Sequence, residues 1–318
     1  MEKQKVNIVS QIKSRDLNMA SKKYIMAHFT KESLTDGEQV YFALSSDGLH
    51  WEDLNGGKAV IKSNIGQKGV RDPFILHSEI DGFWYIIATD LRIASGISWA
   101  DAVKNGSHDM IIWKSKDLVT WSEPWTYTVP LENIGCVWAP EATFDEKRGE
   151  YVVYWASKTF FAESEKHIIY CSRTKDFLHF SLPKVFIEKP SDVIDTTIAF
   201  EGGLYYRFSK DESEGKNIQV DYSRDLTEKF TKLKSESLDK IAFVEGPAVY
   251  KLPSEKWCLL VDFFIARTGY APLVCDDLAS GEWRLLDKDE YDMGKSIKRH
   301  GSVCEISEEE YNRLKENF

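Results

Sequence analysis

A short motif recurs five times along the chain and constrains the fold more than any other feature. The three closest copies are "SSDGLHW" at residue 45, "SKDLVTW" at 115 and "TKDFLHF" at 174; two looser copies are "SRDLTEKF" at 223 and "CDDLASGEW" at 275. Each copy has a small residue or cysteine, an Asp two positions later, and an aromatic residue after a short turn. The Asp can cap the amides of that turn while the aromatic packs beneath it. We therefore expect a structural role for these aspartates.

Between these motifs the chain has the pattern of β-strands. Runs rich in Val, Ile, Tyr, Phe and Trp recur, including "QVYFAL", "FWYIIATDL", "MIIWKS" and "EYVVYWAS", and most are bounded by turn-forming or charged residues. Successive motifs lie 49 to 70 residues apart, which is room for one four-stranded blade per copy. The motif also resembles the Asp-box hairpin. The sequence predicts an all-β, five-bladed β-propeller forming a single domain, residues 1–318.

Helical signals are few. "SEEEYNRLKENF" has helical periodicity, and Ser307 with Glu310 can form a capping box, so we expect a short C-terminal helix within 307–318. A helical turn is expected around 97–106, and residues 1–22 are expected to be an N-terminal extension.

One strand per repeat opens with a polar group. These openings are "RDPFIL" at residue 71, "WAPEATF" at 138, "IDTTIAF" at 194, "VEGPAVY" at 244 and "RHGSVCEI" at 299. Since the first strand of each propeller blade lines the central axis, we expect all five openings to converge at one end of it.

The order of the motifs predicts how the ring closes. "RHGSVCEI" has no repeated motif after it, so its blade must take its outer strands from the N-terminus. We expect strands near 23–30, 39–46 and 58–62 to join a strand near 300–306 in one split blade.

The predicted convergence brings together Asp72, Glu141, Asp195, Glu245 and His300. Several acids at one partly desolvated mouth cannot all ionise at their ordinary pKa values, and separated pKa values are what acid–base chemistry uses. A single carboxylate at a strand start more often caps a turn. Acids at successive openings instead favour a shared catalytic site.

These openings resemble those of glycoside hydrolase family 43, and the resemblance covers about residues 23–305. It implies that Asp72 of "RDP" is the general base, Asp195 of "IDT" a modulator of pKa and Glu245 of "EGP" the general acid. "WAPE" is similar to the family's WAP-acid opening, although the family usually has Asp where this chain has Glu141. The resemblance further implies an axial role for His300, contacting sugar, water or an ion such as calcium, with no cofactor required.

The family resemblance implies hydrolysis of a terminal α-L-arabinofuranosyl or β-D-xylosyl linkage by an inverting single displacement. Galactan-type linkages are a further possibility. The substrate would be a small oligosaccharide or a polysaccharide side chain. Candidate sugar contacts around the mouth are Arg71, Trp138, Glu141, Arg207, Phe264, Arg267 and His300.

Three alternatives remain at this point. Retaining five-bladed fructoside hydrolases also have an "RDP" motif, but it follows an "NDPNG"-type opening that this chain lacks. A mannoside phosphorylase would need a basic phosphate site. A carbohydrate-binding propeller without catalysis is disfavoured because all three catalytic acids are present.

Charge and cysteine content limit the partners and the compartment. A net charge of −10 argues against nucleic acid and anionic membrane surfaces as partners. Five scattered cysteines without a CxxC pair indicate reduced core thiols. The N-terminus "MEKQKVNIVSQIKSRDL" lacks the apolar region of a signal peptide, which predicts a cytoplasmic protein, or a secreted one if a signal has been removed.

Overall fold

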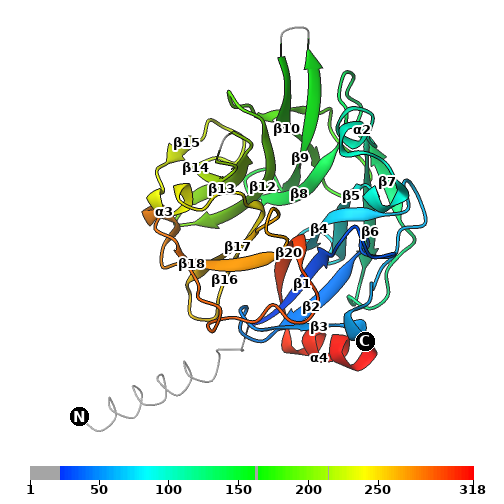
Figure 1. The fold of residues 1–318 in the computed structure, drawn as a ribbon, viewed down its shortest axis with the longest axis vertical. Coiled ribbons are helices and arrows are strands. Elements are labelled where there is room, and N and C mark those ends of the chain that lie inside the picture. The colour runs from blue at the N-terminus through cyan, green and yellow to red at the C-terminus, as the bar shows by residue number, and fades with distance from the viewer. Residues whose placement is uncertain (1–21, 162–163, 214) are drawn as a thin grey trace.

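Five four-stranded antiparallel sheets are arranged in a ring in the computed structural model (Figure 1), which describes residues 22–161, 164–213 and 215–318. The innermost strand of each sheet contacts the innermost strands of both neighbouring sheets, so the ring is closed. The predicted five-bladed β-propeller is confirmed. The expected N-terminal extension lies almost wholly outside the described residues.

Four of the five blades are continuous in sequence, and each runs from its inner to its outer strand. Blade 1 contains β4 (Val70–His77), β5 (Trp84–Asp90), β6 (Asp109–Ser115) and β7 (Trp125–Thr128). Blade 2 contains β8 (Trp138–Asp145), β9 (Glu150–Phe161), β10 (Ser164–Thr174) and β11 (Lys184–Ile187). Blade 3 contains β12 (Val193–Glu201), β13 (Leu204–Asp211), β14 (Ile218–Ser223) and β15 (Thr231–Leu233). Blade 4 contains β16 (Glu245–Lys251), β17 (Trp257–Asp262), β18 (Tyr270–Cys275) and β19 (Arg284–Leu285).

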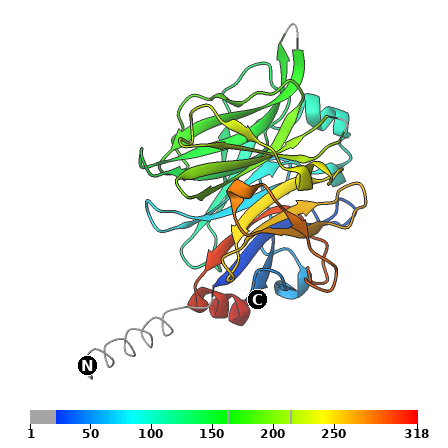
Figure 2. The ribbon, with the colours of Figure 1, turned by 90° about the vertical axis from the view of Figure 1, so that its left-hand side faces the viewer.

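Blade 5 is assembled from both ends of the chain, as predicted. Its inner strand is β20 (Arg299–Ile306), and its outer strands are β1 (Lys23–Phe29), β2 (Tyr41–Ser45) and β3 (Trp51–Asp53). β1 pairs antiparallel with β20 from Lys23 opposite Ile306 onward, and Figure 2 shows the blue and red strands side by side.

The expected outer strand near 58–62 is wrong. The outermost strand is β3, which follows the repeated turn directly and places the buried Trp51 opposite Ser45. Within 58–62 only Ile61 pairs, through an isolated bridge to Val40. The 3₁₀ turn Asn55–Gly57 separates the two segments, and the aromatic residue that packs decides which of them joins the sheet.

Hydrophobic side chains fill the five interfaces between neighbouring blades. There are five separate core clusters in the described residues, and each combines residues from two adjacent blades. Alternate residues of one strand serve the two interfaces: Val153 and Trp155 of β9 face blade 1, whereas Val152 and Tyr154 face blade 3. Because both faces of every sheet are covered, the central strands are apolar runs without polar alternation.

The repeated motifs form the expected turns. In the three closest copies the Asp Oδ1 accepts the backbone N–H groups two and three residues later, at 2.7–2.9 Å. The five aromatic residues each pack in a different core cluster: Trp51, Trp121, Phe180, Phe230 and Trp283. One motif per blade therefore anchors one interface.

Short helices lie between or after the strands of the ring. They are α2 (Trp99–Lys104), α3 (Glu236–Asp239) and α4 (Glu308–Asn317), with 3₁₀ turns at Ile93–Ser95 and Leu278–Ser280. The capping box of Ser307 and Glu310 is present at the start of α4, and α2 lies within the predicted turn at 97–106. All five cysteines are free thiols, as their scattered positions predict.

Candidate active site

Every inner strand carries a β-bulge at its opening. In blade 1, for example, Arg71 lies opposite Thr89 while Phe74 lies opposite Ile87, so the inner strand has one extra residue. Equivalent register shifts occur in the other four blades. A bulge re-aims the side chain of the extra residue and is frequent beside active sites. The residues in this position are Asp72, Ala139, Asp195, Gly246 and His300, and the first four have positive φ angles of 48–57°.

The bulges correct one part of the sequence reasoning. Asp72 and Asp195 occupy equivalent positions, but the other two acids do not. Glu245 comes one residue before its bulged residue, and Glu141 comes two residues after its own. Three catalytic candidates therefore approach the axis by two different geometries.

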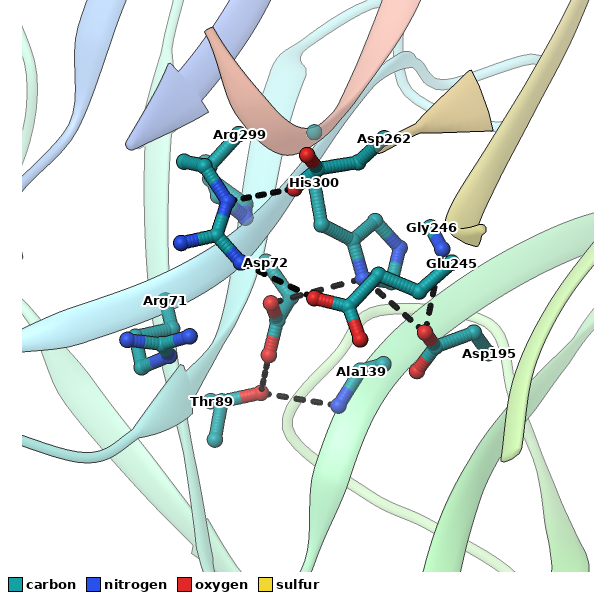
Figure 3. A network of polar contacts seen from close by, with 12 residues as sticks. Arg71, Asp72, Thr89, Ala139, Asp195, Glu245, Gly246, Asp262, Arg299 and His300 are labelled. Carbon is teal, nitrogen blue, oxygen red and sulfur yellow. Dashed lines mark hydrogen bonds and ion pairs between the residues drawn. The ribbon is translucent and has the colours of Figure 1, made fainter. Parts of the chain in front are cut away.

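His300 lies between the two bulged aspartates (Figure 3). Its Nδ1 is 3.4 Å from Asp72 Oδ1 and 3.7 Å from Asp195 Oδ2. The His300 side chain and those of both aspartates are largely buried. Blades 1, 3 and 5 thus meet through one imidazole.

Each aspartate also accepts a hydrogen bond that fixes its orientation. The Thr89 hydroxyl donates to Asp72 Oδ2 at 2.8 Å and itself accepts the N–H of Ala139 at 2.8 Å. The N–H of Gly246 donates to Asp195 Oδ2 at 3.0 Å. The Thr89 bond occupies Asp72 Oδ2 and leaves Oδ1 beside His300.

Glu245 is held by two cations. Its Oε2 accepts a hydrogen bond from Lys210 Nζ and its Oε1 one from Arg299 Nη2, both at 2.9 Å. Arg299 is fixed in turn by the buried Asp262, to which its Nε donates at 2.5 Å. Figure 3 shows the Glu245 carboxyl directed toward Asp72 and Asp195.

The electrostatics of the two acids differ in direction. Burial raises the pKa of Asp195 to about 6, although the positive charges of His300 and Lys210 oppose the shift. Burial also opposes ionisation of Glu245, but Lys210 and Arg299 outweigh it and hold the pKa of Glu245 below its ordinary value. In the free protein the two cations therefore favour the carboxylate form of Glu245, and the role of Asp195 as a modulator of the Glu245 pKa stays a prediction.

A pocket of about 800 Å³ opens beside these residues. Glu245 lines it together with Arg71, Phe264 and Arg267, three residues that the sequence predicts as sugar contacts. The guanidinium of Arg71 is ion-paired with Glu32 and Glu38 at 2.9 and 3.2 Å.

Two predicted contacts lie elsewhere. Arg207 lines a separate pocket of about 690 Å³, where its guanidinium packs 4.0 Å from the Phe230 ring and pairs with Asp221. Glu141 is buried against the Tyr154 hydroxyl, and burial raises its pKa well above the ordinary value. Neither side chain is a lining residue of the pocket that contains Glu245.

Trp138 is partly buried beside that pocket. Its ring packs edge-on against the ring of Trp99, with 6.2 Å between the ring centroids, and Trp99 lines the pocket. The Trp138 ring also stacks on His167, with 5.7 Å between the centroids. Trp138 therefore supports the pocket wall from behind.

Sequence reasoning missed the charged residues around Glu245. Lys210 and Asp262 lie at the ends of the second strands of blades 3 and 4, where antiparallel pairing returns the chain to the mouth opposite Ile194 and Glu245. This antiparallel pairing is the signal in the sequence that could have identified Lys210 and Asp262 as residues at the mouth. It favours Lys210 over Arg207, which lies three residues further from the mouth on the same strand.

No group of three or more His, Cys, Asp or Glu is arranged to hold a metal ion in the part of the chain that the structure describes. Asp72 and Asp195 are each engaged by a hydrogen-bond donor and by His300. An ion near His300 stays a prediction.

Comparison with known proteins shows the family of the chain. Residues 20–312 match the glycosyl hydrolase 43-related family, described as "Probable glycosyl hydrolase domain". An α-L-arabinofuranosidase of Bifidobacterium longum subsp. longum is 29% identical over 233 residues, which cover 64% of this chain and 22% of that protein. The chain thus spans about a fifth of the length of this relative.

Two solved structures show the same fold. A family 43 β-1,3-galactosidase has a TM-score of 0.59 at 13% identity, covering 86% of this chain and 58% of that one. An endo-1,4-β-xylanase from Bacteroides thetaiotaomicron has a TM-score of 0.57 at 12% identity, covering 88% and 93%. Among the described helices, none is long and apolar enough to cross a membrane.

Proposed function

Because the chain belongs to the glycosidases related to glycoside hydrolase family 43, we propose that it removes terminal α-L-arabinofuranosyl groups from oligosaccharides or polysaccharide side chains by inversion of configuration. The observation that carries the proposal is the meeting of Asp72, Asp195 and Glu245 at one end of the propeller axis. The name of the Bifidobacterium relative supports arabinofuranose as the sugar. β-D-Xylosyl and galactan-type linkages are the next candidates.

In the proposed reaction Asp72 is the general base. Its Oδ2 is occupied by the Thr89 hydroxyl, so Oδ1 is the oxygen that takes a proton from the attacking water. The water adds to the anomeric carbon as the glycosidic bond breaks on the opposite face, which inverts the configuration. His300 beside Oδ1 orients Asp72.

Glu245 is the proposed general acid, and it has to gain a proton before it can donate one. In the free protein Lys210 and Arg299 favour its carboxylate form. We infer that a bound sugar, by excluding water and weakening these two ion pairs, raises the pKa of Glu245 in the complex. Asp195, whose carboxyl interacts electrostatically with that of Glu245, adds to this rise when ionised.

Leaving-group dependence tests the two roles. Asp72→Asn should lower kcat about 10²–10⁴-fold on every substrate, because water activation is needed whatever departs. Glu245→Gln should be as severe on arabino-oligosaccharides but much milder on aryl arabinofuranosides, whose leaving groups depart without a proton. Steady-state kinetics on a panel of aryl arabinofuranosides, xylosides and galactosides measures both effects and identifies the sugar.

Proton NMR of the first-formed product completes this test, with Asp117→Asn in a repeated turn as the control variant. The first anomer should be inverted relative to the substrate. Retention would make Asp72 a nucleophile, and turnover that depends on inorganic phosphate would indicate a phosphorylase. A protein that binds the sugars but hydrolyses none of them would contradict the proposed enzyme function.

A further inference from the structure

The pocket that contains Glu245 is rich in cations. Among its lining residues are Lys31, Arg71, Arg267 and Arg299, against only two acids, Glu32 and Glu245. The whole chain carries a net charge of −10. This pocket therefore has an excess of positively charged residues, whereas the protein as a whole is negatively charged.

Two of the four cations are neutralised by neighbours. Arg71 pairs with Glu32 at 2.9 Å, and Arg299 pairs with Glu245 at 2.9 Å and with Asp262 at 2.5 Å. These pairs hold the side chains in place around the proposed acid and leave no charge to spare for a ligand.

The other two cations have no such partner. Neither Lys31 nor Arg267 forms an ion pair with any residue in 22–161, 164–213 or 215–318. Both side chains belong to exposed residues and line the same pocket. Arg267 lies in the loop between β17 and β18, whereas Lys31 follows β1. Two blades thus each present a free cation to one cavity.

Apolar side chains line the same pocket as these cations. Trp99 is 48% exposed and Ile265 64% exposed, and both line the pocket with Phe264. Exposed apolar and aromatic surface of this kind is typical of ligand sites. It offers a platform for the face of a sugar ring, and the two cations suit a negatively charged group on that ring.

We propose that this pocket binds a uronic acid residue of the substrate, with Arg267 and Lys31 contacting its carboxylate. The guanidinium of Arg267 can bind a carboxylate through two parallel hydrogen bonds, and Lys31 adds a second positive charge. The inference rests on the proposed function, because Glu245 places the cleaved bond in the same pocket. The preferred substrate is then an acidic glycan carrying arabinofuranosyl groups near a uronic acid.

Chemical reduction of the substrate carboxyls provides a matched comparison. A plant arabinogalactan bearing glucuronic acid and a glucuronoarabinoxylan are each used as the native polymer and after reduction of glucuronic acid to glucose. On whichever of the two polymers the wild type hydrolyses better, its KM should be about three- to tenfold lower for the native form than for the reduced form. This factor is in line with two partly exposed charge pairs. High salt should remove the difference.

Substitutions then assign the effect to the pocket. Arg267→Ala should lower the ratio of the two KM values, and the double variant K31A/R267A should bring it close to one. Lys175→Ala serves as the control, because Lys175 is an exposed cation in the repeated turn of blade 2; its ratio should stay at the wild-type value. Equal KM values for both forms of both polymers, or a ratio that survives K31A/R267A, would overturn the proposal.

A binding measurement separates this inference from the proposed function. Calorimetric titration of Glu245→Gln with acidic oligosaccharides and their reduced forms requires no turnover. Tighter binding of the acidic forms, lost in the variant that also lacks Lys31 and Arg267, supports the pocket assignment even if arabinofuranosides are not cleaved. Hydrolysis of aryl arabinofuranosides without any preference for acidic glycans contradicts this inference alone.

Discussion

At the scale of single residues, two charges act on the carboxyl of Glu245 in opposite directions. Lys210 Nζ is 2.9 Å from Glu245 Oε2 and favours the ionised form. The carboxylate of Asp195 accepts a hydrogen bond from the N–H of Gly246, the residue after Glu245. When Asp195 is ionised, its negative charge disfavours the ionised form of Glu245. Because a general acid must carry its proton, the pKa of Glu245 sets the alkaline limb of the pH–rate profile.

Substitution of the two residues should move that limb in opposite directions. Lys210→Met removes a positive charge, so the alkaline limb of kcat/KM should move to higher pH. Asp195→Asn removes a negative charge, so the alkaline limb should move to lower pH. Each shift should be about one pH unit for a charge this close. The measurement is kcat/KM against pH on a substrate with a poor leaving group.

Lys216→Met is the matched control, since Lys216 contacts Glu212 in the same ionic network but not Glu245. Its profile should follow the wild type. In the wild type the alkaline limb of kcat should lie at higher pH than that of kcat/KM, because kcat reports the complex and kcat/KM the free enzyme. Shifts of equal sign in the Lys210 and Asp195 variants would refute the assignment of Glu245 as the acid.

The sequence located Asp72, Asp195 and His300 because each lies within a recognisable strand opening. It did not locate Lys210 or Arg299 as partners of Glu245. These partners come from the two neighbouring blades, Lys210 from blade 3 and Arg299 from blade 5, and their reach depends on side-chain direction rather than on spacing along the chain. The effect of these two cations on the pKa of Glu245 could not be predicted from the sequence for the same reason.

At the scale of the elements, the bulge at each inner strand decides what faces the axis. An extra residue leaves no mark in the letters of a strand, so the non-equivalence of Glu245 and Asp72 was not visible. Gly246 shows why the "EGP" opening has glycine. Its φ is +57°, and a Cβ atom there would lie 2.5 Å from Cγ of His300. The backbone has to come this close for its N–H to reach Asp195.

Gly246→Ala tests this close approach. A positive φ costs an alanine about 1–2 kcal/mol, and the clash with His300 should add about 1–3 kcal/mol of overpacking. Displacing His300 should also lower kcat/KM by roughly 100-fold. Denaturant unfolding and steady-state kinetics measure the two effects.

Gly202→Ala supplies the reference for backbone strain alone. Gly202 has a φ of +58°, nearly that of Gly246, but a Cβ atom there meets nothing within 4 Å. This variant should lose about 1 kcal/mol and keep its activity. If both variants lose the same stability and Gly246→Ala stays active, the packing of His300 on Gly246 does not constrain the site.

At the scale of the whole molecule, the ring depends on the pairing of β1 with β20. Sequence order alone predicted this closure, since one strand opening had no motif after it. The third outer strand was misplaced because β3 is only three residues long and follows its turn at once. Helix α4 then packs Leu314 into the cluster between blades 5 and 1, and the Trp84 indole donates to Glu310.

Two truncations separate the roles of α4 and β20. A chain ending after Ile306 lacks α4 but keeps β20; it should fold, remain active and show a lower Tm because Leu314 and its neighbours are lost. A chain ending after Lys298 lacks β20 and should show no cooperative unfolding by circular dichroism. A cooperative transition near the wild-type Tm in the shorter chain would mean that four blades are stable without closure.

The split blade also sets when the enzyme becomes active during its synthesis. The ribosome synthesises β1, β2 and β3 before the sixteen strands of blades 1 to 4 and β20 after them, so the outer strands of blade 5 remain without their inner strand until four blades have been made. That last strand brings both Arg299 and His300. A nascent chain that has not yet reached β20 therefore has neither a closed ring nor a complete candidate site, and both are completed by the same strand.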